Sequence, residues 1–437
     1  MKYQAYPEYK DSGVEWLGEV PSHWEVFRMD DLAETIKNQV SPNDLNSILV
    51  THYSIPNVQS YGTGATEEGQ TIDSSKFLVN EGDVLFSKLN PRKQTITTVS
   101  KHDHRVVAST EFVVLRPVLN DQSFINYLFH SQELNSFACA RVESATKSHQ
   151  RINPSIISKL KFFAASPEDR RKIANFLDQE TQKIDNIIAK QQNLIELLKE
   201  KRQAVISHAV TKGINQNVKM KDSGVEWLGE TPEHWSISQI VHCAFVTKLT
   251  GFEYTNLWRP SEDGEIIALR GYNIKERELD LAKVERISYN LSKKLKRSKL
   301  YKGDIVFPCT GTIGNAALIK HDDKFHINQN IAKICFDSTV MPDFAIYWLT
   351  STFTRDLIDK NNMSGMQPVV LIGDIRKLPI PRLPIDEQVM ITNYLDQKMD
   401  QFNKLIDRVE CATKLLQERK TALISAAVTG KIDVRNA

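Results

Sequence analysis

The stretch KDSGVEWLGEVPSHW at residues 10–24 occurs again, almost unchanged, as KDSGVEWLGETPEHW at residues 221–235. Thirteen of the fifteen positions are identical at a constant offset of 211 residues, which excludes coincidence. Repetition at a long period indicates that one structural unit occurs more than once. The sequence therefore predicts a tandem duplication in which each copy opens with the same folded lead-in.

Shorter and less similar repeats follow inside each copy, and they predict its secondary structure. EGDVLF at 81–86 and KGDIVF at 302–307 are Gly-Asp turns that lead into β-rich apolar runs. STEFVVLRP at 109–117 and NQNIAKICF at 328–336 share only a pattern of apolar residues. Helices are predicted after these strands, over residues 122–137 and 342–359. Each copy is therefore expected to contain a globular α+β head.

The longest repeated segment has the pattern of a helix. Residues 168–211 align with 386–429 at a constant offset of 218 without a gap, and 15 of these 44 positions are identical. Neither segment contains Gly or Pro, and acidic residues lie in each first turn. Apolar residues recur at heptad spacing, as in Leu177 and Ile184 or Leu395 and Phe402. A stripe of this length needs a partner helix, which the other copy can supply, although a spacer in any multidomain protein has the same pattern.

These observations give a map of the whole chain. It consists of a first head at 1–160, a long helix at 167–211, a linker at 212–221, a second head at 222–380 and a second long helix at 385–429.

Composition excludes several classes of protein. The 437 residues are 41% hydrophobic and 25% charged, and no stretch approaches the roughly 18 consecutive apolar residues of a membrane span. We therefore expect a cytoplasmic protein without a signal peptide. The net charge of +2 gives no support to nucleic-acid binding, so any DNA contact must come from local clusters. The five cysteines are far apart and lack a CxxC pair, which predicts reduced thiols.

A catalytic site is not evident in the sequence. There is no P-loop, and the Asn-Pro pairs at 90–91 and 153–154 lack the second proline and aromatic that hold a flipped adenine. The triplet Glu418-Arg419-Lys420 lies in a predicted helix and is interpreted as a solvated face. His102 and His104 have no paired carboxylate at a metal-ligand spacing.

Several segments together resemble one family, the specificity subunits of type I restriction-modification enzymes. They are the repeated lead-in, the GDVLF and GDIVF turns, GTIGNAALI at 311–319, IRKLPIPRLPIDEQ at 375–388 and LISAAVTGKI at 423–432. The first copy departs from the family pattern, because it has SPEDRRK at 166–172 where the second copy has PIDEQ.

The resemblance implies a fold and a function. Two target-recognition domains would each read one half of a bipartite, asymmetric DNA sequence, and the two long helices would pack as an antiparallel coiled coil. That arrangement would bring the two ends of the chain together. Two methyltransferase (M) subunits and the restriction (R) subunits would dock on this chain, which would have no catalysis or cofactor of its own. S-adenosylmethionine, ATP and Mg would belong to those partner subunits.

Candidate DNA-binding residues follow from local charge and from the resemblance. The run SKKLKRSKLYKG at 292–303 contains six cations and no acid, and such a run is either a solvated face or a track for phosphates. SATKSHQRIN at 144–153 offers donors to base edges, whereas its counterpart NNMSGMQPVV at 361–370 is nearly uncharged. The candidates are Lys88, Arg92, Lys93, Arg105, Lys147, His149, Gln150, Arg151, Lys293, Lys294, Lys296, Arg297, Lys299, Thr312 and Asn315.

Two other functions compete with this interpretation. One is a coiled-coil adaptor whose heads bind proteins or glycans, which predicts no shift of DNA even with partners present. The other is a cryptic nuclease, which predicts metal-dependent cutting by the purified chain alone.

Overall fold

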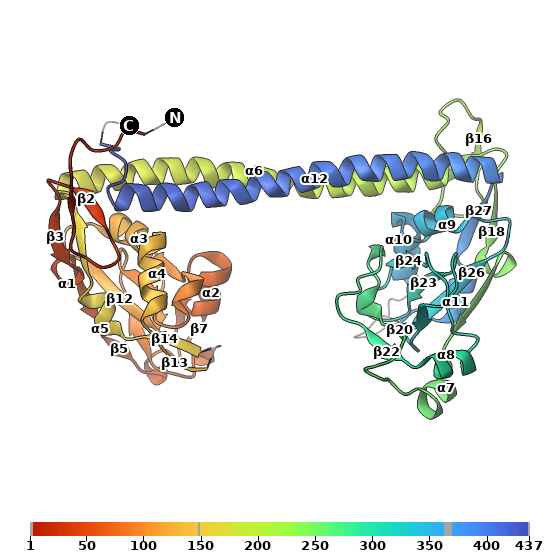
Figure 1. Cartoon of the computed structure of the whole chain (residues 1–437), viewed down its shortest axis with the longest axis horizontal. Helices are drawn as coiled ribbons and strands as arrows, with labels where there is room; N and C mark the ends of the chain where they lie inside the picture. The colour runs from red at the N-terminus through yellow and green to blue at the C-terminus, as the bar shows by residue number, and fades with distance from the viewer. Residues whose placement is uncertain (1–2, 147–148, 362–368, 436–437) are drawn as a thin grey trace. The chain divides into compact units, whose positions relative to one another are not determined.

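The computed structural model describes residues 3–146, 149–361 and 369–435. The chain forms two compact units, unit 1 from residues 1–192 with 410–437 and unit 2 from residues 193–409. Each unit contains one head and one half of each of two long helices, α6 (Pro167–Lys212) and α12 (Ile385–Val428) (Figure 1). The duplication is therefore visible as two heads, each attached to a helix pair.

The head of unit 1 contains two main sheets. The four-stranded sheet has the order β10-β9-β12-β4, and the five-stranded sheet has the order β5-β8-β11-β6-β7. All pairs are antiparallel except β11 with β6. The strands are β4 (Ala33–Ile36), β5 (Gln39–Val40), β6 (Leu49–Tyr53), β7 (Ala65–Glu68), β8 (Lys76–Leu78), β9 (Val84–Ser87), β10 (Ile96–Thr98), β11 (Arg105–Ser109) and β12 (Phe112–Pro117).

The head of unit 2 repeats this plan. A five-stranded sheet has the order β19-β26-β23-β24-β21, and a three-stranded sheet has the order β22-β20-β25, in which β20 and β25 are parallel. The predicted α+β class is confirmed in both heads. The strands are β19 (Ala244–Lys248), β20 (Ile266–Leu269), β21 (Glu276–Arg277), β22 (Glu285–Ile287), β23 (Ile305–Pro308), β24 (Ala316–Leu318), β25 (Phe325–Ile327) and β26 (Ile331–Phe336).

The repeated lead-in folds in the same way twice. It forms the hairpin of β1 (Tyr9–Asp11) with β2 (Glu19–Pro21), and again that of β16 (Met220–Asp222) with β17 (Glu230–Pro232). The next strand, β3 (Glu25–Arg28) or β18 (Ser236–Gln239), pairs with the strand that precedes the long helix, β15 (Lys161–Ala164) or β27 (Pro379–Arg382). Trp24 and Trp235 are fully buried. The lead-in is therefore conserved between the copies because it closes each head onto its helix.

The aspartate of each repeated Gly-Asp turn links that turn to a neighbouring strand. The carboxylate of Asp83 accepts two hydrogen bonds of 2.8 Å from Arg116 on β12. The carboxylate of Asp304 lies 2.7 Å from the ammonium of Lys333 on β26, and both of these side chains are buried. A buried carboxylate is stable only when it is paired, so the aspartate fixes the turn against the central strand of each head.

Each helix predicted after the central strands is in fact two helices. Residues 122–137 are divided between α3 (Gln122–His130) and α4 (Gln132–Ala140), and residues 342–359 between α9 (Pro342–Leu349) and α10 (Thr352–Asn361). Ser131 has an extended backbone at the break, and its Oγ accepts a hydrogen bond from the backbone N–H of Leu134. Because serine is a strong N-cap, it restarts the helix in a new direction.

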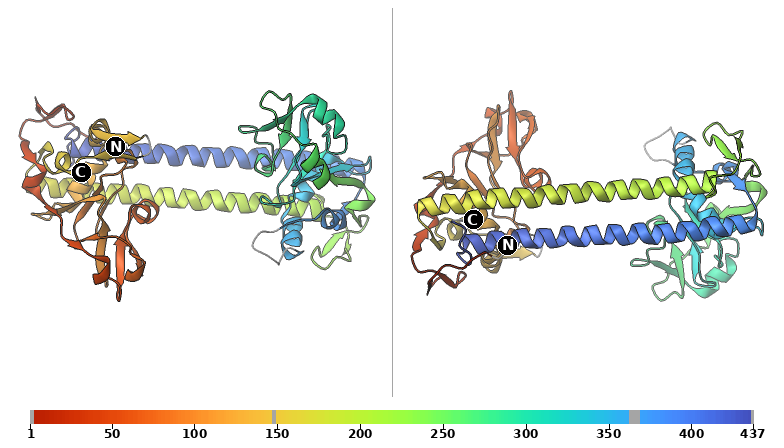
Figure 2. Two further views of the ribbon diagram at one scale, coloured as in Figure 1. Left: turned by 90° about the horizontal axis from the view of Figure 1, so that it is seen from below. Right: turned by 90° about the horizontal axis from the view of Figure 1, so that it is seen from above.

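The long helices run antiparallel within each unit. In unit 1, Leu177 near the start of α6 packs in one core with Leu423 near the end of α12, and Lys420 donates to Asp185. The opposite chain directions of the two helices can be followed in Figure 2. In unit 2, Ile206 near the end of α6 shares a core with Ile391 near the start of α12. The prediction of an antiparallel pair is confirmed.

The two ends of the described chain lie together in unit 1, as expected. Gln4 and Asp433 form an antiparallel bridge, in which the backbone N–H of Asp433 donates to the carbonyl of Gln4 at 2.8 Å (Figure 1). Within the described ranges, none of the helices has the length and apolar character that a membrane crossing requires.

In the segment SPEDRRK, where the first copy departs from the family pattern, Arg170 takes the structural place that Gln388 has in the second copy. Arg170 corresponds to Gln388 at the offset of 218, and both side chains are buried. Arg170 donates to the carbonyl of Ala165, and Gln388 donates to the matching carbonyl of Leu383, each at 3.0 Å. Two different residues therefore connect the start of each long helix to its head.

The glycine that ends each long helix provides a matched pair of tests. Gly430 and Gly213 both have a left-handed φ, of +77° and +75°. A Cβ on Gly430 would lie 2.4 Å from Cδ of Pro21, whereas one on Gly213 would have no neighbour closer than 3.5 Å. Gly213→Ala should therefore cost only the backbone strain of about 1–2 kcal/mol, and Gly430→Ala should cost distinctly more. Thermal unfolding of the two full-length variants measures the difference, and equal shifts would contradict the packing at Gly430.

Candidate nucleic-acid interface

Two of the predicted basic segments of the first head meet in the structure. The loop at 88–94 follows β9, and the hairpin of β13 (Val142–Thr146) with β14 (His149–Ile152) lies against it. The backbone N–H of Asn90 donates to Gln150 at 2.7 Å, and that of Ile152 donates to Lys88 at 3.0 Å. Segments about 60 residues apart in the sequence therefore form one surface.

The loop at 88–94 has an unusual backbone. Asn90 and Gln94, at the two ends of the 3₁₀ turn η3 (Pro91–Lys93), both have positive φ values, of 50° and 45°. Non-glycine residues in this region cluster at functional sites, where the surrounding structure holds them. The turn presents the exposed side chains of Arg92 and Lys93.

One carboxylate organises the cations of this surface. Glu111 accepts from Arg151 at 2.9 Å through one oxygen. Burial lowers the pKa of Lys88, while the nearby Glu111 carboxylate opposes that shift. The Arg151 side chain remains 61% exposed, so it is positioned by Glu111 and still accessible. Such a guanidinium can make bidentate contacts with a guanine or a phosphate.

A third segment of the first head joins this surface. The helix α2 (Ile55–Tyr61) reaches the residue that follows the loop, because Nε2 of Gln59 donates to Oγ1 of Thr95 at 2.8 Å. Its last residue, Tyr61, is 73% exposed. An exposed aromatic ring on a segment that is bonded to a basic segment is a typical combination of nucleic-acid surfaces.

The second head brings together the corresponding three segments with other residues. The backbone N–H of Val370 donates to the carbonyl of Cys309 at 2.8 Å, which is the counterpart of the bond from Ile152 to Lys88. The TGTIGN loop at 310–315 thus replaces the basic loop at 88–94. Oγ1 of Thr312 donates to Gly271 at 3.1 Å, which joins the loop to η5 (Gly271–Asn273).

Exposed side chains differ between the two surfaces. Tyr272 in η5 is 43% exposed and lies near the guanidinium of Arg270. Asn315 donates its Nδ2 to the carbonyl of Ile274 at 3.2 Å, so its amide holds the loop in place. Both surfaces therefore expose an aromatic ring, but the second offers hydroxyl groups where the first offers guanidinium and ammonium groups.

The basic run at 292–303 lies beside the three-stranded sheet of the second head. It begins in α8 (Tyr289–Lys294), and its exposed cations are Lys293, Lys294, Lys296, Arg297 and Lys302. Arg297 donates to Oγ1 of Thr247 at 3.1 Å, and Lys299 is paired with Asp323. Lys293, Lys294 and Lys296, which lie around the end of α8, are thus exposed members of the predicted phosphate track.

The structure separates the predicted residues into groups. Lys88, Arg92, Lys93, Gln150 and Arg151 lie on one surface, and Thr312 and Asn315 lie on its counterpart. Arg105 is on β11 within the five-stranded sheet, away from the hydrogen bonds that join the loop and hairpin. Lys147 and the side chain of His149 lie outside the described residues, as do residues 362–368 of the counterpart segment.

The sequence did not single out Tyr61, Glu111 or Tyr272. The two tyrosines neighbour Gly62 and Gly271, and a tyrosine beside a turn glycine is the only local signal that the sequence contains. Glu111 becomes relevant only through its pairing with Arg151 across the head.

A metal centre is not apparent in the part of the chain that the structure describes. Within it, no group of three or more His, Cys, Asp or Glu side chains lies close enough to hold an ion. The two surfaces hold donors, cations and aromatic rings, which suit binding.

Comparisons with known proteins identify the family of the chain. The family model described as "Type I restriction modification DNA specificity domain" matches residues 21–197 and 259–410, which is more than half of the chain. The putative type I restriction enzyme MjaX specificity subunit of Methanocaldococcus jannaschii is 21% identical, over 96% of this chain and 96% of that protein. The type I restriction enzyme EcoBI specificity subunit of Escherichia coli is 23% identical, over 60% of this chain and 56% of that protein.

The fold is also found in a solved structure. A chain from a structure titled as the basis of complex assembly and conformational transition of the type I R-M system matches with a TM-score of 0.71. The match covers 94% of this chain and 98% of that chain at 15% identity, so it shows a shared fold.

Proposed function

Because the chain belongs to the family of type I restriction-modification specificity subunits and has two recognition domains, we propose that it binds a bipartite, asymmetric DNA sequence. Each head would read one half. The observation that supports this is the convergence of the same three segments in both heads with different exposed residues. Because equivalent segments of the two heads expose different side chains, the two heads are suited to recognise different base sequences.

The surface of the first head is proposed to recognise DNA through charge-assisted hydrogen bonds. Arg151, held by Glu111, would contact a guanine edge or a phosphate, and Arg92 and Lys93 would contact phosphates. In the second head, Thr312 and Tyr272 would contact bases or sugars, and Lys293, Lys294 and Lys296 would follow the phosphate backbone.

Catalysis is assigned to partner subunits. The chain would dock two methyltransferase subunits, which use S-adenosylmethionine, and restriction subunits, which use ATP and Mg. It would contribute binding and no bond-making step or cofactor of its own. The proposed DNA target and partner subunits imply that it acts in the cytoplasm.

Exchange of one head tests this proposal. The segment between β3 and β15 should be replaced by the corresponding segment of another family member, and the methylated motif of the assembled complex should be sequenced. We expect one half of the motif to change, with the other half and the spacing unaltered, because the second head is untouched. A change in both halves would contradict independent reading. Cutting of DNA by the purified chain with Mg²⁺ alone would favour the nuclease instead.

A further inference from the structure

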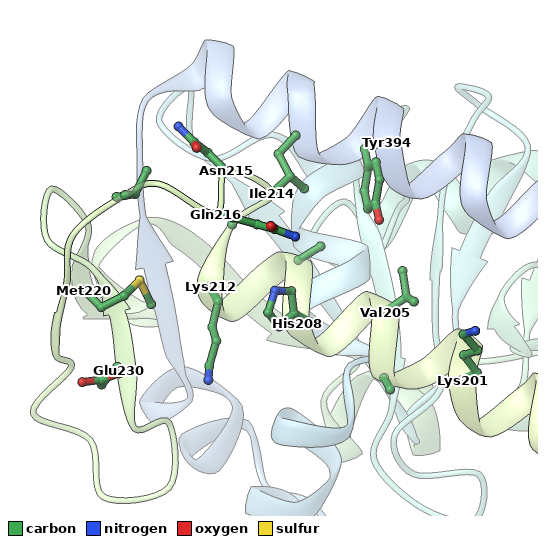
Figure 3. Close-up of a pocket in the computed structure, with 14 residues that line it drawn as sticks. Lys201, Val205, His208, Lys212, Ile214, Asn215, Gln216, Met220, Glu230 and Tyr394 are labelled. Carbon is green, nitrogen blue, oxygen red and sulfur yellow. The ribbon is translucent and has the colours of Figure 1, made fainter.

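The helix pair of unit 2 carries a cavity of about 700 Å³. It lies between the end of α6, the linker that follows, and the start of α12. Figure 3 shows Tyr394 on α12 facing Val205 and His208 on α6, with Ile214 of the linker beside them. The size and the mixture of apolar and polar walls fall within the range of ligand-binding pockets.

The corresponding groove of unit 1 is filled by an aromatic side chain. At the offset of 218, Tyr394 corresponds to Phe176 and Lys201 to Arg419. The ring of Tyr3 packs edge-on against Phe176, with centroids 5.3 Å apart and an interplanar angle of 86°. Arg419 lies within electrostatic reach of the same tyrosine. Unit 1 therefore shows what kind of group fits this part of the helix pair.

Chain connectivity explains why only one groove is filled. Unit 1 contains two chain ends at this place, residues 3–9 and residues 430–435, which pair with each other. Unit 2 contains a single linker at 212–220 that must replace both. Ile214 aligns with Tyr3 at one offset and with Ile432 at the other, and it is 38% exposed. One residue cannot fill two places, so the cavity remains.

The charge around the groove differs between the units. In unit 1 the hydroxyl of Tyr3 donates to Glu180 at 3.5 Å. The counterpart of Glu180 in unit 2 is Lys398, whose ammonium lies 5.8 Å from the Tyr394 ring centre. Lys201 and Lys212 line the cavity with one carboxylate, Glu230. The polar end of an occupant therefore meets cations in unit 2.

We propose that this cavity binds a peptide segment of a partner subunit that presents an aromatic side chain beside a carboxylate. The proposal deepens the proposed function and rests on its subunit docking. The N-terminal segment of a second copy is a poor occupant, because it would lose the same contacts in its own unit 1. It also follows that the two ends of the helix pair are unequal for identical partners, since one groove is already filled.

A synthetic peptide of residues 3–8, YQAYPE, is a suitable probe because it contains the aromatic and acidic groups. The full chain keeps its own unit 1 groove filled, so added peptide reports on unit 2. We expect saturable binding of one peptide per chain by fluorescence anisotropy. A peptide with both tyrosines replaced by alanine should bind at least about tenfold more weakly.

Matched variants locate the site. Val205→Trp should fill the cavity, and Lys201→Glu should reverse its charge at an exposed position, so each should weaken binding at least about tenfold. Arg419→Glu makes the same type of change at the matching position of unit 1 and should leave binding within about twofold. No saturable binding, or equal loss from Arg419→Glu, would overturn the proposal. Neither result affects the methylated motif, so the proposed function is judged separately by the head exchange.

Discussion

Replacing Arg170 with methionine should lower the stability of unit 1 by about 3–5 kcal/mol, the cost of leaving a buried charge without its partner. Arg170 is 1% exposed, and its Nη2 donates to Oδ2 of Asp121 at 2.8 Å. Asp121 is 6% exposed and stands immediately before α3. Without Arg170 this carboxylate would remain buried, and the junction between head and long helix would loosen. The corresponding fall in the unfolding midpoint is roughly 6–20 °C for a unit of this size.

Two comparisons separate charge from packing. The double variant Arg170→Met with Asp121→Ala removes both charges and should recover most of the loss, since no isolated ion remains. Gln388→Met removes the neutral equivalent in unit 2, where Gln388 accepts from Met341 at 2.8 Å and donates to Leu383. It should cost about 1–3 kcal/mol. Scanning calorimetry of the full chain is the measurement, and a larger loss for Gln388→Met than for Arg170→Met would contradict this account.

The features that can be predicted from the sequence are those that occur in both copies of the duplication. The lead-in, the Gly-Asp turns and the long helices each occur in both copies, so a pattern in one was supported by its echo in the other. The helix pair was predictable for a physical reason as well. A heptad stripe of more than 40 residues exposes too much apolar surface to remain alone.

Long-range pairing was not predictable. The contact of the loop at 88–94 with Gln150 joins backbone atoms across about 60 residues, and neither segment contains a signal for the other. The same limit applies to charge. Lys299 was indistinguishable from its neighbours in the basic run, yet it pairs with Asp323 from a different segment. The sequence shows which residues are charged, but only the fold shows which of these charges are paired within the protein and which are free to contact DNA.

The break at Ser131 is not predictable from local periodicity. The residues on both sides of it are apolar at helical spacing, so periodicity alone continues the helix. The capping bond of the serine and its extended backbone interrupt that pattern. The SPEDRRK departure was similarly ambiguous, because an arginine at this position reads as a surface cation until Asp121 is known to face it.

The salt dependence of DNA binding should fall sharply when Lys293, Lys294 and Lys296 are replaced by alanine together. Each lysine that contacts a phosphate releases a counterion, so each contributes about 0.9 to the slope of the logarithm of affinity against that of salt. Loss of three contacts should therefore reduce the decline in affinity between 50 and 200 mM salt by up to about 40-fold. The three side chains are exposed and lie around the end of α8, so their removal should leave the fold intact.

A matched triple variant controls for net charge. Lys190, Lys199 and Lys404 are exposed on the long helices, and their replacement by alanine removes the same charge from another part of the chain. Filter binding of the full chain to its methylated motif, over a series of salt concentrations, should give an unchanged slope for this control. The base preferences of the α8 variant should also be unchanged, because phosphate contacts carry no sequence information. An unaltered slope for the α8 variant would mean that its lysines form a solvated face. A changed motif would mean that they contact bases, and the phosphate track would then have to lie elsewhere on the second head.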